Sequence, residues 1–144
     1  MSGAFQTECL ILPQLWGPYN SIMSQILLEK KSFIINSFDQ AKEAVKQNIG
    51  RDLSLISAPE AALYSGPSYF INLKNELEKI YNYLNIKMWI DCGKNPGLAM
   101  KTIRQGGKNI IFSEPKIFQI HEMANLENVE IIDSISDIID LSKN

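Results

Sequence analysis

The chain has 144 residues, of which 45% are hydrophobic and 21% are charged, and its formal net charge at pH 7 is −2. These totals are those of one ordinary globular domain, large enough to bury about two-thirds of the surface that its unfolded chain would expose. A chain so close to neutral lacks the basic surface of proteins that bind nucleic acid or anionic membranes, so neither partner is expected.

The cysteines and the amino terminus indicate where the protein works. The two cysteines, Cys9 and Cys92, have neither the number nor the spacing of a disulfide framework or a zinc site. We therefore expect reduced thiols, no bound metal and a cytoplasmic protein. The longest apolar run near the amino terminus, residues 9–12, is far too short for a signal core or a membrane span, and no basic region precedes it.

Residues 1–31 do not follow the pattern of the rest, and we interpret them as an N-terminal extension packed on a single domain over residues 32–144. Two prolines interrupt the extension, and residues 19–31 could form a short helix. Its apolar side chains must cover an apolar surface, either of the same domain or of a second subunit in a homodimer. These side chains are Phe5, Leu10, Leu12, Leu15 and Trp16.

Two units of strand and helix follow the extension. Residues 32–36 predict a strand, and Ser37 with Gln40 three positions later has the form of a capping box that starts a helix running to about residue 48. Residues 53–57 predict the second strand, followed by a loop over 58–66. Pro67 then starts an amphipathic helix, whose apolar residues recur at a spacing of three and four: Phe70, Leu73, Leu77, Ile80 and Leu84.

Three further units complete the chain. A strand over residues 87–90 breaks at 91–93, and a helix starts at Pro96. A fourth strand over 108–113 precedes a helix from Pro115 to about residue 126. The last unit is a strand over 129–133 followed by a short helix over 134–141.

Five apolar strands alternating with helices predict an α/β domain. We expect a three-layer αβα sandwich whose open, mostly parallel sheet has five strands and helices on both faces. A flavodoxin-like strand order of 2-1-3-4-5 is favoured over a Rossmann-like order of 3-2-1-4-5. In either case the strands should end on one edge of the sheet, where such sheets bind ligands. The predicted strand ends are Asn36, Ser57, Asp91, Ser113 and Asp133.

The strand ends supply the candidate ligand-binding residues. Three helices place proline at their first position directly after a strand, so their free N–H groups favour an anion at that edge, although such starts are common in any fold. The chain contains no P-loop and no Gly-x-Gly-x-x-Gly motif. We place the site in the crevice between the loops after the first and third strands. The candidates are Ser37, Ser57, Tyr64, Asp91, Cys92, Lys94, Asn95 and Ser113.

Two catalytic alternatives use residues of this set. Cys92 precedes a helix start with Lys94 nearby, a setting that lowers the pKa of a thiol, whereas the adjacent Asp91 opposes that shift and a buried structural cysteine is the simpler reading. The only histidine, His121, lies in the middle of a predicted helix. Asp91 with Glu60 and Glu114 could form a carboxylate group for a hard cation or for acid-base chemistry, if the loops converge.

The strand ends also invite comparison with the receiver domains of two-component signalling. Asp91 and Ser113 occupy the places of the phosphoacceptor aspartate and of the serine or threonine that ends the fourth strand there. Asn36 and Ser37 stand where receivers carry a magnesium-binding acidic pair, and residues 129–133 contain no lysine. The receiver pattern is therefore not adopted.

A second resemblance covers residues 53–113. Ser57-Ala-Pro59, Gly66-Pro67, Asp91-Cys-Gly93, Pro96-Gly-Leu-Ala99 and residues 107–113 look like small bacterial α/β domains that carry no assigned activity. The resemblance implies the fold and no chemistry.

The sequence favours a cytosolic, non-catalytic domain that binds a small polar or anionic ligand or acts in regulation, with an unknown cofactor. Two alternatives stay open. One is a small enzyme that acts on an anionic or carbonyl substrate through Cys92 or Asp91, and the other is an interaction module that dimerises through its N-terminal segment.

Overall fold

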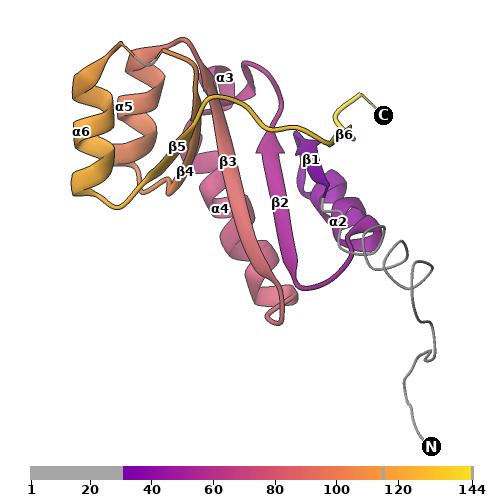
Figure 1. Cartoon of the computed structure of the whole chain (residues 1–144). Coiled ribbons are helices and arrows are strands. Elements are labelled where there is room, and N and C mark those ends of the chain that lie inside the picture. The colour runs from indigo at the N-terminus through magenta and orange to yellow at the C-terminus, as the bar shows by residue number, and fades with distance from the viewer. Residues whose placement is uncertain (1–30, 115, 144) are drawn as a thin grey trace, which may run out of the picture. The chain divides into compact units, whose positions relative to one another are not determined.

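A sheet of six parallel strands runs through the residues that the structure describes, 31–114 and 116–143 of this computed structural model (Figure 1). The predicted α/β class with an open parallel sheet is confirmed, with one strand more than expected. Since every described strand pair is parallel, the carboxyl ends lie on one edge, as predicted. The strands are β1 (Ser32–Ile35), β2 (Asp52–Ser57), β3 (Asn85–Gly93), β4 (Asn109–Phe112), β5 (Glu130–Ile132) and β6 (Ile138–Asp140).

The strand order is β5-β4-β3-β2-β1-β6, so both predicted orders are wrong. Each of the first four strands lies beside the next in sequence, β6 lies beside β1, and β2 separates β1 from β3. The expected reversal of the strand order between β1 and β3 is therefore absent, and so is the crevice that we placed between these two strands. From β1 to β5 each new strand is added to the same edge of the sheet, whereas β6 is added to the opposite edge, beside β1.

The five described helices form one layer against one face of the sheet. In that layer α2 packs on α4, α4 on α5, and α5 on α6, so the expected helices on both faces are not observed. Alternate strand residues such as Phe33, Leu55 and Ile90 point into the core beneath these helices. The helices are α2 (Phe38–Gln47), α3 (Ala61–Ser65), α4 (Pro67–Ile80), α5 (Pro96–Arg104) and α6 (Phe118–Leu126).

The opposite face carries a smaller apolar cluster of Ile56, Trp89 and Ile111, against which Ile135 packs. Ile135 belongs to the segment that joins β5 to β6, drawn in yellow across the strands in Figure 1. The six residue steps from Ile132 to Ile138 reach about 21 Å when fully extended. The five strand spacings between β5 and β6 measure about 24 Å along a flat sheet. The sheet is therefore not flat between β5 and β6.

Local signals placed several helix starts correctly. Ser37 Oγ accepts a hydrogen bond from the Gln40 backbone N at 3.2 Å, as the predicted capping box requires. The reciprocal bond differs by one residue, because Gln40 Oε1 accepts from the Asn36 N at 2.6 Å and not from the Ser37 N. Pro67 and Pro96 occupy the first positions of α4 and α5, as expected.

Three predicted elements differ in the structure. The loop over 58–66 contains the short helix α3, and the fourth helix begins at Phe118, while Pro115 lies outside the described residues. The predicted helix over 134–141 is instead the strand β6, paired with β1. Asp137 there has a φ of 55°, a left-handed conformation that no helix contains, and the β-branched residues after it suit the open edge of β1.

No described helix has the length and apolar character needed to cross a membrane. Residues 1–30 of the proposed N-terminal extension, with its apolar side chains and Cys9, lie outside the described residues.

Candidate functional site

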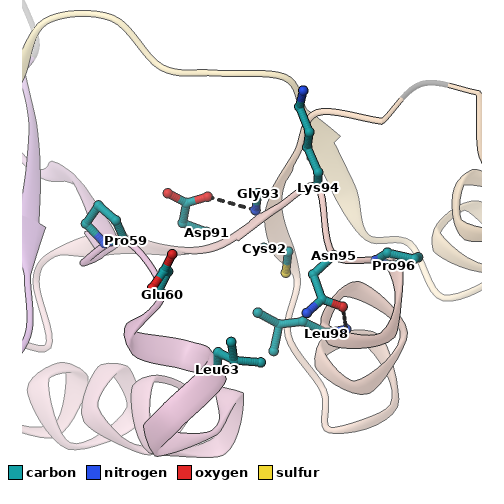
Figure 2. Close-up of a pocket in the computed structure, with 10 residues that line it drawn as sticks. All are labelled: Pro59, Glu60, Leu63, Asp91, Cys92, Gly93, Lys94, Asn95, Pro96 and Leu98. Carbon is teal, nitrogen blue, oxygen red and sulfur yellow. Dashed lines mark hydrogen bonds between the residues drawn. The ribbon is translucent and has the colours of Figure 1, made fainter.

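A pocket of about 510 Å³ opens at the carboxyl edge of the sheet, between the loop after β2 and the loop after β3 (Figure 2). One wall comes from the segment that leads into α3, and the other from the tip of β3 and the start of α5. The lining residues are Pro59, Glu60, Leu63, Asp91, Cys92, Gly93, Lys94, Asn95, Pro96 and Leu98.

The tip of β3 is held from both neighbouring strands. The Asp91 backbone N donates to Ser57 Oγ of β2 at 2.9 Å. The Ser113 N and Oγ, which follow β4, donate to the Gly93 carbonyl at 2.9 and 3.2 Å. The β3–β4 register shifts between Asp91 and Gly93, and Asp91 Oδ1 accepts from the Gly93 N at 3.0 Å across that bulge. This wall of the pocket is therefore fixed by the fold itself.

The start of α5 satisfies most of its own backbone donors. Asn95 Oδ1 accepts from the Leu98 N at 3.0 Å, and the Asn95 N donates to the Cys92 carbonyl at 3.0 Å. Pro96 has no N–H to offer. Of the first three residues of α5, only Gly97 has a backbone N–H that makes none of these bonds. The helix start can therefore offer an anion fewer donors than the sequence suggested.

Two carboxylates share the rim of the pocket. Glu60 precedes α3 with a φ of 65° and makes no side-chain capping bond, and Asp91 stands on the neighbouring strand tip. Two of the three carboxylates expected to converge are thus brought together, whereas Glu114 is not among the lining residues. In the part of the chain that the structure describes, no group of three or more potential ligands surrounds a metal-sized space.

Cys92 is buried and points toward α5. Burial raises the pKa of the Cys92 thiol from 9.0 to about 11, a hydrogen bond with Thr102 offsets part of this, and the Asp91 charge raises the pKa further. The Thr102 hydroxyl donates to the Leu98 carbonyl at 2.8 Å. The Cys92 sulfur also lies 3.6 Å from Thr102 Oγ1, and either atom could be the donor in that contact.

His121 does not approach Cys92 in the pocket. It lies on α6, its ring centroid is 6.3 Å from that of Phe112, and its Nε2 is buried without a hydrogen-bond partner among the described residues. The structure therefore supplies no histidine base for the thiol.

The eight candidates from the sequence fall into three groups. Asp91, Cys92, Lys94 and Asn95 line the pocket. Ser57 and Ser113 hold the strand tip from behind it. Ser37 caps α2, and Tyr64 on α3 is 79% exposed and does not line the pocket.

Sequence reasoning missed the apolar part of the site. The sequence predicts a loop over residues 58–66, which gives Leu63 no defined face, and it assigns no role to Leu98. The run Ala61-Ala-Leu63 favours helix, and that signal was available in the sequence.

Fold and site define an α/β domain with a preformed pocket at the carboxyl edge of a parallel sheet. Comparison with the models of known protein families and with curated proteins finds no match. The function is therefore argued from the pocket.

Proposed function

We propose that this protein is a cytosolic, non-catalytic domain that binds a small polar ligand in the pocket between the β2 and β3 loops. The observation that supports this most directly is the pocket itself, which combines a polar rim with an apolar floor. Asp91, Glu60 and Lys94 belong to the rim, and Leu63 and Leu98 belong to the floor. Sites for small molecules have this composition, with a few placed polar groups to orient the ligand.

The stiffness of the β3 tip also favours binding. Because Ser57 and Ser113 tie the tip to both neighbouring strands, Asp91 needs little ordering when a ligand arrives. A preorganised wall loses less conformational entropy on binding, and more of the contact energy then appears as affinity.

The catalytic alternative gains no comparable support. A thiol whose pKa is about 11 is almost wholly protonated near neutral pH, so Cys92 is a poor nucleophile. For Asp91, the other residue of the enzyme alternative, the only charged neighbours among the lining residues are Glu60 and Lys94. The dimerisation alternative depends on residues outside the described part of the chain.

A thermal-shift screen of small polar metabolites, with and without magnesium, tests the proposal. A ligand at about 100 times its dissociation constant should stabilise the protein by roughly 2.7 kcal/mol. The key variant is Leu63→Ala, because Leu63 is 51% exposed and its truncation removes part of the pocket wall without opening the core.

Leu126→Ala is the matched control, since Leu126 is 80% exposed on α6 and does not line the pocket. The control should respond to the ligand as wild type does, whereas Leu63→Ala should bind about tenfold more weakly through lost apolar contact. The proposal fails if no compound stabilises the wild type, or if both variants bind equally well.

A further inference from the structure

The charge of the pocket restricts the ligands that it can hold. Its lining contains two carboxylates, Glu60 and Asp91, and one ammonium group, Lys94, so the formal charges sum to −2 + 1 = −1. Neither carboxylate forms an ion pair within the described residues. In Figure 2 both carboxylates lie on the α3 side of the pocket, and the Lys94 side chain extends away from Leu63 and Leu98.

The hydrogen-bonding capacity of Asp91 is only partly used. One of its oxygens accepts a single bond, from the Gly93 N at 3.0 Å, while an ionised carboxylate offers about four acceptor sites. Glu60 makes no capping bond to α3. The rim thus presents acceptors, and groups that donate hydrogen bonds and carry positive charge match them best.

The donors that an anion would need are scarce by comparison. Asn95 Oδ1 already takes the Leu98 N–H and Pro96 has none, which leaves the Gly97 N–H at the start of α5. An anion would also meet the repulsion of Asp91 and Glu60. The partial positive charge of the helix start is therefore opposed by two full negative charges nearby.

The apolar floor of the pocket favours a ligand that also has a hydrocarbon part. The Leu63 side chain is half exposed in a pocket that Leu98 also lines, and in Figure 2 both leucines are drawn below the two carboxylates. Hydrocarbon placed there would remove apolar surface of both partners from water.

From these features we infer that the ligand is a small organic cation, with an ammonium-type group at Asp91 and Glu60 and a hydrocarbon part on Leu63 and Leu98. The inference rests on the proposed binding function and specifies its ligand class. A mixed pocket of this kind distinguishes an amine from an acid of the same shape by charge alone.

Three probes of similar shape test the inference: phenethylammonium, 2-phenylethanol and 3-phenylpropanoate. Each is titrated into the full chain at pH 7, and binding is followed by the amide NMR signals of Gly93, Asn95 and Leu98. Phenethylammonium should bind about tenfold more tightly than 3-phenylpropanoate, with the alcohol between them, because the first gains and the last loses one charge interaction. Higher salt should narrow the difference.

Glu60→Gln and Asp91→Asn should each reduce the preference for the ammonium probe several-fold. Both substitutions keep the shape of the side chain, and the new amide oxygen at position 91 can still accept the Gly93 N–H. Glu122→Gln on α6 is the matched control, because Glu122 is exposed and does not line the pocket. Its preference should equal that of wild type.

The outcomes separate the inference from the proposed function. If all three probes bind without preference, or the propanoate binds best, the cation inference is overturned while the binding function stands. If magnesium alone shifts the same amides and displaces phenethylammonium, the carboxylates hold a metal and the inference is likewise overturned. If no probe shifts these amides, the cation inference is overturned, and the thermal-shift screen decides the binding function separately.

Discussion

The hydroxyl oxygen of Ser57 lies 2.9 Å from the backbone nitrogen of Asp91 and accepts its hydrogen bond. Ser57 is fully buried at the end of β2, one residue beyond the last β2–β3 register pair, Ile56 with Trp89. The Ser57 side chain thus supplies a hydrogen bond between β2 and β3 just beyond the last backbone pair of these two strands. It positions the strand tip that carries Asp91 into the pocket and does not itself line it.

Ser57→Ala should destabilise the fold by about 1–2 kcal/mol, because the Asp91 N–H loses its acceptor in a partly buried position. Urea denaturation measures this loss. Ser54→Ala is the control, since Ser54 lies on the same strand and makes no described side-chain hydrogen bond, and it should change stability by less than about 0.5 kcal/mol. Equal effects of the two substitutions would contradict the role assigned to Ser57.

The Cys92 thiol should react slowly with iodoacetamide. A rise in its pKa from 9.0 to about 11 lowers the thiolate fraction at pH 8 about 100-fold, and burial slows the reagent further. The assay requires a Cys9→Ser background, so that a single thiol is observed. Unfolding in urea should restore the rate of an ordinary cysteine. Fast labelling of the folded protein at pH 8 would revive the nucleophile alternative.

The same shift makes stability depend on pH in alkaline solution. The folded thiol keeps its proton up to about pH 11, whereas the unfolded thiol loses it near 9.0, so the folded state binds more protons between these values. The contribution of the thiol is complete below pH 9 and is lost as the pH rises through 11, by roughly 2–3 kcal/mol. Denaturation of wild type and Cys92→Ala at several pH values measures how the free energy of unfolding of each protein changes with pH, and the difference is the contribution of the thiol. If the free energy of unfolding depended on pH in the same way in both proteins, the predicted contribution of the thiol would be refuted.

Asn95 has a capping role that can be separated from the pocket. Asn95→Ala should cost about 1 kcal/mol, because the Leu98 N–H loses the acceptor that now lies 3.0 Å away. Asn95→Asp keeps an acceptor at the same place and adds a charge that suits a helix start, so its stability should equal or exceed that of wild type. The melting temperatures of the two variants decide the point. A loss of similar size in both would show that the cap is unimportant.

Two glycines should respond to alanine with opposite signs. A Cβ at Gly107 would lie 2.5 Å from Thr102 Cγ2 and 3.1 Å from the Thr102 carbonyl oxygen, so Gly107→Ala should destabilise by about 1–3 kcal/mol. A Cβ at Gly97 would make only an ordinary contact, 3.4 Å from Asn95 Oδ1. Gly97→Ala should therefore stabilise α5 by about 0.5 kcal/mol, by reducing the freedom of the unfolded chain. Chemical denaturation of both variants measures whether each substitution lowers or raises the free energy of unfolding.

Four of the ten residues that line the pocket were candidates from the sequence, and the reason is local. Asp91, Cys92, Lys94 and Asn95 lie in one short segment between a strand and a helix, so a single correct assignment places all four at the carboxyl edge. Glu60 and Leu63 come from the start of α3 and from α3 itself. Their position opposite that segment follows from β2 lying directly beside β3, which no local pattern specifies.

The sequence by itself determined the features whose interactions span a few residues. These are the capping box of Ser37 and Gln40, the helix starts at Pro67 and Pro96, and the alternation of apolar strands with helices that makes the sheet parallel. Only the tertiary structure decided the strand order, the single layer of helices and the strand character of residues 138–140. Each of these depends on contacts between segments that are far apart in the sequence. The hydrogen bonds that β6 gains exist only because β1 lies beside it, and a sequence pattern cannot report a partner about 100 residues away.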